Sequence, residues 1–190
     1  MKPKTIEPWK VLASREVFSA PPWISVFRET IRLPDGKVID DYHKIGLLDF
    51  VMIVAESPDG NILLERQYKH GPGRVCLTLP AGGIGEGETP LAAAQRELLE
   101  ETGCASDDWQ QLGAFTANAS YGCGTMNLFR ARGVKKIAEP DSGDLEEMEM
   151  VFLPPAELLH AIAAGELTAL SSVAAIALAL NPDFTRQSGS

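Results

Sequence analysis

Three glutamates, Glu97, Glu100 and Glu101, are the side chains of this sequence best suited to hold a divalent cation. They stand at i, i+3 and i+4, so a helix through them places all three carboxylates on one face. Like charges at this spacing repel one another, and the negative end of the helix dipole adds to the cost. On the three glutamates alone, a solvated acidic helix face is the simpler interpretation, because Glu is a good helix former.

The neighbours of these glutamates favour the cation site. Glu88 precedes the helix, and Arg96 lies inside it, next to the three carboxylates. The segment before the helix contains four glycines, which allow the backbone to approach a metal or a phosphate closely: Gly82, Gly83, Gly85 and Gly87. We therefore expect a divalent-cation site here, and such cations would allow an acidic protein to bind a diphosphate by lying between carboxylate and phosphate.

The helix itself has clear start and stop signals. Thr89 is the expected N-cap, Pro90 the first helical residue, and Gly103 the residue that ends the helix. Residues 80–88 are expected to be irregular. The stripe expected to pack against a sheet comprises Leu91, Ala94, Gln95, Leu98 and Thr102.

Alternating apolar and polar residues around this helix predict an α+β fold with a mixed sheet. The expected strands are 17–19, 23–32, 38–45, 50–55, 61–68, 75–79, 111–115, 125–131 and 147–153, and further helices are expected at 155–164 and 170–180. The strands before residue 46 are too few to be stable alone, so they must pack on the rest of the chain or on a partner subunit. The expected organisation is an N-terminal β region at 1–47, a main domain at 48–183 and a disordered tail at 184–190.

Composition excludes several classes of partner. Of the 190 residues, 45% are hydrophobic and 23% charged, as in ordinary globular proteins, and the net charge is −9. This charge argues against a nucleic-acid polymer as partner, because phosphate backbones need clustered cations. No apolar run is long enough to cross a membrane, and no apolar core follows the N-terminal lysines, so a cytoplasmic location is expected.

The cysteines and histidines do not make a metal or disulfide motif. The cysteines are odd in number and lack C-x-x-C spacing, so free thiols are expected. The histidines are scattered, so a zinc site is not expected. These residues are Cys76, Cys104, Cys123, His43, His70 and His160.

The segment from Gly82 to Cys104 resembles the Nudix signature, G-x5-E-x7-R-E-U-x-E-E-x-G-U, where U is aliphatic. The match ends on Cys104, where an aliphatic residue is usual, and otherwise runs through Gly82, Glu88, Arg96, Glu97, Leu98, Glu100, Glu101 and Gly103. The resemblance implies a pyrophosphohydrolase with an α/β/α sandwich around a mixed sheet.

The same resemblance implies a role for each side chain. Glu97, Glu100 and Glu101 would hold Mg²⁺ or Mn²⁺, with the carbonyl of Ala81 as a further ligand. Arg96 would brace the glutamates, and Glu88 would fix the glycine-rich loop to the helix. Cations in this position neutralise diphosphate oxygens and lower the pKa of a bound water, which makes Glu100 and Arg96 part of the catalytic set.

Motifs outside this segment resemble ADP-ribose and nucleotide-sugar pyrophosphatases. Residues 65–69 and 79–82 resemble the pattern RQYR…LPAG of that group, which makes Arg66 and Lys69 candidate substrate-binding residues. Residues 9–42 resemble the part that builds a small sheet exchanged across a homodimer. The implied substrate is therefore a nucleoside diphosphate sugar, and the implied assembly is a homodimer.

Three departures from the subgroup pattern leave the sugar open. Lys69 replaces the second arginine of RQYR and loses its bidentate fork. Thr78 stands where that group has the glutamate of LELPAG, and residues 117–119 lack its usual proline.

The subgroup also places a catalytic acid on a loop after the signature. Residues 141–149 are the acidic loop downstream, where Glu146 is the first candidate for the base, with Asp144 and Glu147 behind it. A merely solvated loop is the alternative. Aromatic side chains that would stack a nucleobase, or else pack in the core, are Trp9, Trp23 and Tyr42.

Two other functions stay open on the sequence. One is cleavage of a dinucleotide such as NADH or a diadenosine polyphosphate, although the SQPWPFPxS stretch associated with NADH cleavage is missing. The other is a sensor with the Nudix fold that binds a nucleotide sugar without hydrolysis. Such sensors often lose glutamates of the signature, and this sequence keeps them.

Overall fold

A computed structural model of the chain describes residues 6–141, 143, 147–181 and 183–184. The chain divides into two compact units, Met1–Leu48 with Thr116–Thr125, and Asp49–Phe115 with Met126–Ser190. The first unit thus takes in Thr116–Thr125, a segment that the sequence analysis assigned to the main domain. Within the described ranges, no helix is long and apolar enough to cross a membrane.

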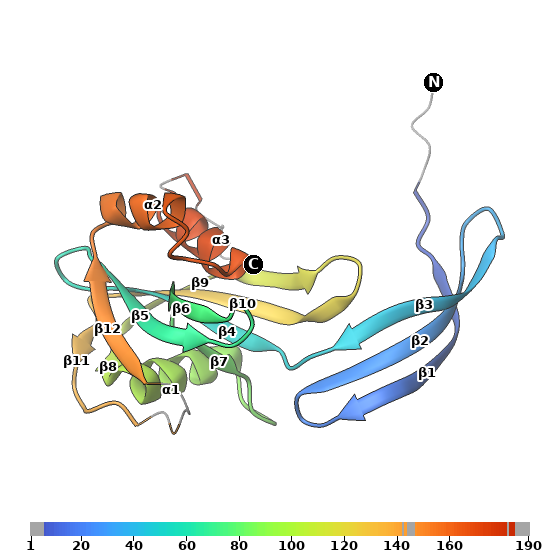
Figure 1. Cartoon of the computed structure of the whole chain (residues 1–190), viewed down its shortest axis with the longest axis horizontal. Helices are drawn as coiled ribbons and strands as arrows, with labels where there is room; N and C mark the ends of the chain where they lie inside the picture. The colour runs from blue at the N-terminus through green and yellow to red at the C-terminus, as the bar shows by residue number, and fades with distance from the viewer. Residues whose placement is uncertain (1–5, 142, 144–146, 182, 185–190) are drawn as a thin grey trace. The chain divides into compact units, whose positions relative to one another are not determined.

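The first unit is built on a three-stranded antiparallel sheet of β1 (Lys10–Ala20), β2 (Ile24–Arg32) and β3 (Val38–Gly46) (Figure 1). The predicted small N-terminal sheet is therefore confirmed, with β1 longer than expected. In the turn between β2 and β3, the side chain of Asp35 accepts a hydrogen bond from the Lys37 N–H at 3.0 Å. Most of β1 is exposed in the single chain, including its apolar side chains.

The second unit contains a mixed sheet, which confirms the predicted fold class. Its strands are β4 (Phe50–Glu56), β5 (Ile62–Lys69), β6 (Arg74–Thr78), β7 (Ala81–Gly83) and β12 (Met148–Leu153), with parts of β9 (Asp108–Asn118) and β10 (Gly122–Arg132). The pair β4–β10 is parallel, whereas β5 pairs antiparallel with β6 and β12. Two short strands, β8 (Cys104–Ala105) and β11 (Lys135–Lys136), pair separately.

The expectation that residues 80–88 are irregular is wrong for β7. Its three residues pair antiparallel with β4, from Ala81 opposite Met52 to Gly83 opposite Phe50. Glycines in this segment do not prevent the pairing, because backbone hydrogen bonds need no side chain. The start of the glycine-rich loop is thereby fixed to the centre of the sheet.

Helices cover both faces of the main sheet (Figure 1). On one face α1 (Pro90–Thr102) packs against odd-numbered residues of the strands, such as Val51 and Leu63. On the other, α2 (Pro155–Ala163) and α3 (Leu170–Ala179) pack against even-numbered residues, such as Val54. This alternation follows from the two-residue period of a strand, and it confirms the predicted α/β/α sandwich.

The sheet opens between β4 and β5. Among the described residues, the two strands pair at Glu56 and Ile62, beside the turn that joins them. Further along, β4 pairs with β7, and β5 pairs with β6. The two central strands therefore diverge toward the end of the sheet where the glycine-rich loop begins.

Candidate active site

The ends of α1 are fixed by the residues that the sequence predicts. The side-chain oxygen of Thr89 accepts a hydrogen bond from the Ala92 N–H at 3.2 Å, and Pro90 is the first helical residue. Gly103 ends the helix in the left-handed region, with φ of 68°, and a Cβ there would overlap the carbonyl oxygen of Ala138. Both predicted caps are confirmed.

The buried face of α1 differs from the predicted stripe, because Leu91 and Gln95 are exposed. Ala94, Leu98 and Thr102 are buried as expected, but Leu91 is 41% exposed and Ala93 is fully buried. The small side chain of Ala93 lets the helix approach the sheet closely. The expected contributions of Leu91 and Gln95 to the packing stripe are therefore wrong.

Glu97 lies directly against the backbone of the glycine-rich loop. A Cβ on Gly82 would overlap the carboxylate carbon and both carboxylate oxygens of Glu97. Gly82 has no positive φ, so the missing side chain, rather than backbone freedom, is what this position requires. The first glycine of the motif thus makes room for a glutamate fifteen residues later in the chain.

Arg96 stands at the centre of a carboxylate network that joins the loop to the helix. Its Nε and Nη2 donate to the two oxygens of Glu88, each at 2.9 Å, and Nη2 also donates to the carbonyl of Gly83 at 2.9 Å. Its Nη1 donates to Glu97 at 2.7 Å and to Glu100 at 3.0 Å. All five guanidinium N–H groups therefore have an acceptor.

This network changes the ionisation of its members. Hydrogen bonds from Arg96 and from the Gly85 N–H lower the pKa of Glu88 from 4.5 to about 2. Hydrogen bonds to Glu88, Glu97 and Glu100 raise the pKa of Arg96 further above its usual value. One permanent cation is thus shared by three carboxylates, which leaves an excess of negative charge beside the loop.

Glu101 faces a different neighbour from the other two helix glutamates. Its side chain is buried, and its Oε2 accepts a hydrogen bond from the Ala81 N–H at 3.0 Å. The sequence analysis named the carbonyl of Ala81 as a metal ligand, and the contact found here involves the amide of the same residue. Glu101 is in this way tied to β7, the strand that leads into the glycine-rich loop.

The donor set fits a hard divalent cation by its chemistry. Glu97, Glu100 and Glu101 offer carboxylate oxygens, which Mg²⁺ and Mn²⁺ prefer, and the excess negative charge favours a cation. One oxygen each of Glu97 and Glu100 lies within 3.0 Å of the same Arg96 nitrogen. In the described part of the chain, no three Asp, Glu, His or Cys side chains converge tightly enough to enclose a metal.

Lys69 and Glu101 line the same cavity, of about 230 Å³, where β4 and β5 diverge. Its wall also contains Gln67 from β5, Thr78 from β6 and Ala81 from β7. Of the two cationic residues predicted to bind substrate, Lys69 is therefore the one that shares a cavity with a helix glutamate.

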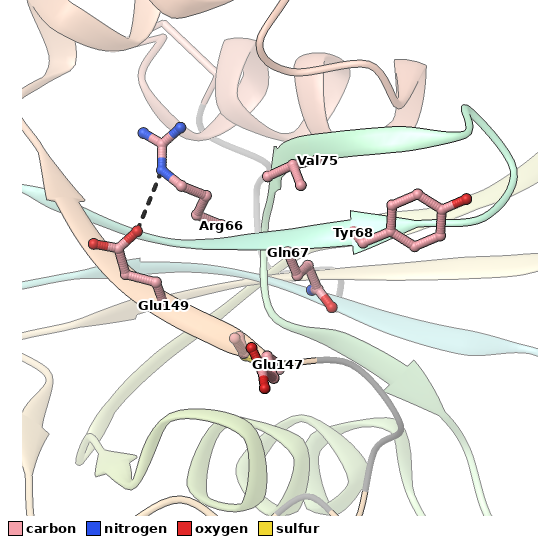
Figure 2. A pocket seen from close by; sticks show the side chains of 7 residues that line it. Arg66, Gln67, Tyr68, Val75, Glu147 and Glu149 are labelled. Atoms are coloured by element: carbon pink, nitrogen blue, oxygen red, sulfur yellow. Dashed lines mark ion pairs between the residues drawn. The ribbon is translucent and has the colours of Figure 1, made fainter.

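Arg66 lies on the opposite side of β5 from Gln67 (Figure 2). It forms ion pairs with Glu149 at 3.5 Å and Glu166 at 3.8 Å, and it lines a second pocket, of about 580 Å³, which has Gln67 in common with the first. Glu147, the third candidate for the catalytic base, is exposed and lines this second pocket. The structure therefore does not bring Arg66 together with the carboxylates of α1.

The remaining candidates lie elsewhere. Glu146 and Asp144 are outside the residues that the structure describes. Tyr42 donates a hydrogen bond to the carbonyl of Ser120 at 2.5 Å within the first unit, and its ring meets that of Trp9 edge-on. Trp23 is 73% exposed, so within the single chain it does not pack in a core.

Sequence reasoning missed two buried polar residues, Glu65 and Gln67. Both belong to the quoted motif 65–69, yet neither was singled out. The signal was present in the alternation of β5, because Leu63 is in the core on the α1 face and Glu65 and Gln67 continue that face. Polar residues that continue a buried face indicate a site or a hydrogen-bond network.

Comparison with known protein families finds a match for the main domain and for the N-terminal region of the chain. Residues 48–171 match the NUDIX domain, which is well over half of the sequence. The chain belongs to the Nudix family. Residues 9–45 of this Nudix chain match the nucleoside diphosphate sugar hydrolase N-terminal domain.

The free thiols that the sequence predicts at its three cysteines are confirmed by the structure.

Individual proteins agree with this assignment. An ADP-ribose pyrophosphatase of Mycobacterium tuberculosis is 30% identical over 78% of this chain and 72% of its own length. One of Bacillus subtilis is 28% identical over 75% of each chain, and a mouse ADP-sugar pyrophosphatase is 35% identical over 63% and 59%. A solved structure of an ADP compounds hydrolase shares the fold, with a TM-score of 0.81, 24% identity, and coverage of 93% and 94%. This Nudix chain is a pyrophosphohydrolase.

Proposed function

We propose that this Nudix hydrolase cleaves the diphosphate of ADP-ribose or a related nucleoside diphosphate sugar, giving a nucleoside monophosphate and a phosphosugar. The observation that carries the proposal is the network in which Arg96 holds Glu88, Glu97 and Glu100, beside a cavity that Glu101 lines. The names of the relatives and the match of residues 9–45 support a nucleotide-sugar substrate rather than a nucleic-acid polymer.

The proposed cofactor is Mg²⁺, with Mn²⁺ as an alternative. Glu97, Glu100 and Glu101 would hold it, with the Ala81 carbonyl as a further ligand. A bound divalent cation neutralises the diphosphate and makes a bound water more acidic. Arg96 holds Glu97 and Glu100 in place, and Glu88 fixes Arg96 to the loop. Arg66, Lys69, Trp23 and Tyr42 are the proposed substrate-binding residues.

The test is release of phosphate from a panel of nucleoside diphosphate sugars, coupled to a phosphatase, in the presence of Mg²⁺. We expect ADP-ribose or another sugar of this class to be the best substrate, and chelation of the metal to abolish turnover. Preference for NADH or a diadenosine polyphosphate would transfer the assignment to the dinucleotide class. Binding of nucleotide sugars without hydrolysis would make the protein a sensor.

Glu146 is the proposed catalytic base. The helix glutamates are engaged in metal binding under this proposal, so a separate carboxylate must take the proton, an effect worth about 10²- to 10⁴-fold. Glu146→Gln should lower kcat by that factor and leave KM and metal affinity little changed. Loss in Asp144→Asn or Glu147→Gln alone would move the role to that residue, and no loss in any of the three would reject a base on this loop.

The proposed assembly is a homodimer formed through the N-terminal β region, residues 1–47, with hydrolysis assigned to residues 48–183. The support is β1, an edge strand whose apolar side chains Val11 and Phe18 are 56% and 55% exposed in the single chain. Exposed apolar edge strands readily pair with another chain. Light scattering should give twice the 20.5 kDa chain mass, and a monomer throughout the micromolar range would reject the dimer.

A cytoplasmic location is also proposed, since the cysteines are free.

A further inference from the structure

Arg66 and Gln67 are consecutive residues of β5 whose side chains lie on opposite sides of the strand (Figure 2). Gln67 donates hydrogen bonds to Glu65 and Thr78, each at 2.9 Å, and all three residues line the cavity of about 230 Å³. Arg66 does not line that cavity and lines the pocket of about 580 Å³ instead. The place of Arg66 in the sequence motif 65–69 therefore does not by itself bring it to the substrate.

The positive charge of Arg66 is already opposed by carboxylates. Its Nε lies 3.5 Å from Glu149, and its Nη1 lies 3.8 Å from Glu166. Among the described residues that line the pocket of about 580 Å³, Arg66 is the one cation, whereas Glu147 and Glu149 are acidic. With Glu166, three negative charges stand against one positive charge here. Such surroundings repel a diphosphate, because like charges interact unfavourably.

Glu166 lies in the connection between α2 and α3, which is attached to the sheet through β6. The Leu77 N–H donates a hydrogen bond to the Glu166 carbonyl at 2.9 Å. The Arg74 side chain donates to the carbonyl of Gly165, the preceding residue, at 2.6 Å. The ion pair with Arg66 adds a contact to β5, so this connection is held by two adjacent strands.

The same connection continues into the wall of the cavity of about 230 Å³. Thr168 follows Glu166 by two residues, and both Thr168 and Ser172 line that cavity. Ser172 belongs to the first turn of α3 and is 1% exposed, so the start of α3 packs closely at this wall. A displacement of Glu166 is therefore passed over two residues to a side chain of the cavity.

We infer that Arg66 is a positioning residue that acts through Glu166. It holds the α2–α3 connection on β5, and so fixes the cavity wall at Thr168, without contacting the diphosphate. The inference rests on the proposed function and changes the role proposed there for Arg66. Exposed ion pairs contribute little, so we expect their loss to change the rate only about two- to fivefold.

The test is a double-mutant cycle of Arg66→Met and Glu166→Gln in the full chain, with kcat/KM for ADP-ribose measured in Mg²⁺. Each single variant should lower kcat/KM about two- to fivefold. The double variant should be no slower than Arg66→Met, because both changes remove the same contact. If Arg66 instead binds the diphosphate, Glu166→Gln frees the guanidinium and raises kcat/KM. Opposite signs, effects that multiply, or no effect of Glu166→Gln would overturn the inference.

Glu157→Gln is the matched control, because it removes the same charge from an exposed residue of α2 that lines neither pocket. It should leave kcat/KM unchanged, and it reports how one negative charge fewer affects an anionic substrate. A change in Glu166→Gln that equals the change in this control would also overturn the inference.

Hydrogen exchange of the peptide that contains Thr168, measured without substrate, gives a second readout that does not depend on hydrolysis. Exchange should be faster in Arg66→Met and Glu166→Gln and unchanged in Glu157→Gln, because the connection loses a contact to the sheet. Faster exchange with unchanged kcat/KM would leave Arg66 a structural role only and overturn the inference.

The two readouts also let the inference and the proposed function fail separately. Faster exchange in both variants of a protein that hydrolyses no nucleoside diphosphate sugar supports the positioning of the wall and rejects the proposed function. Hydrolysis by wild type, with unchanged exchange in both variants, overturns the positioning role and leaves the proposed function intact. Unchanged exchange without hydrolysis rejects both.

Discussion

Two polar clusters of the second unit differ in how completely their hydrogen bonds are satisfied. Around Arg96, five N–H groups meet five acceptors from the loop and the helix. Around Gln67, two donors are matched and one buried acceptor is left over. A fully satisfied network holds its members in one geometry. A cluster that leaves a buried acceptor unpaired is instead less stable than one in which every polar group is paired.

The largest effect is expected at Glu101, which contacts β7 and also lines the cavity of the Gln67 cluster. Glu101→Gln removes one charge with little change in volume, so the cation site loses a ligand while the cavity keeps its shape. We expect kcat at saturating Mg²⁺ to fall by orders of magnitude. Near-normal turnover would exclude Glu101 from the catalytic set.

A smaller effect is expected from a methyl group inside the Arg96 cluster. Gly82→Ala places a Cβ where the Glu97 carboxylate lies, so Glu97 must move. A displacement of about 1 Å costs on the order of 10²-fold in rate. Steady-state kinetics should show this loss in kcat, whereas Gly133→Ala, at a glycine with open space around it, reports the cost of a methyl group at a positive-φ glycine outside the site. Equal rates in both variants would contradict the packing of Glu97 on Gly82.

The smallest effect is expected at Glu88, on stability rather than rate. Its folded-state pKa of about 2 lies below the 4.5 of the free side chain, so its ionised form stabilises the folded protein above about pH 4.5. That contribution is lost as the pH falls toward 2. Urea denaturation should therefore show Glu88→Gln less stable than wild type at pH 7, with the difference shrinking between pH 4.5 and 2. A difference independent of pH would mean that Glu88 acts by packing alone.

The Arg96 cluster was predictable because its members are close in sequence. Thr89, Pro90 and Gly103 are local signals, and the i, i+3, i+4 spacing of the glutamates alone places them on one face. The strands of the main sheet were found for a similar reason, since alternation is a local pattern. What these signals could not give is the partner of Glu101, because Ala81 lies twenty residues away on β7.

The Gln67 cluster was not predictable, because it depends on how strands pair. Glu65 and Thr78 meet only through the register of β5 and β6, and the cavity exists because β4 and β5 part. The register also bears on one departure from the subgroup pattern. Thr78 lacks the glutamate of LELPAG, but the carboxylate of Glu65 lies 3.4 Å from its hydroxyl, on the neighbouring strand. A sequence pattern within one strand therefore does not reveal a carboxylate that the neighbouring strand contributes.

Cys76 also lines the cavity, as a free thiol that is 3% exposed. A second buried free thiol, Cys104, packs instead in the core beneath α1. Cys76 can therefore report on whether the cavity is occupied, and Cys104 can serve as the internal reference in the same protein. Small electrophiles that enter the cavity would reach Cys76 there, whereas Cys104 lies in the core and the half-buried Cys123 does not line the cavity. Covalent fragment screening by mass spectrometry becomes possible on the unmodified sequence, with no engineered cysteine.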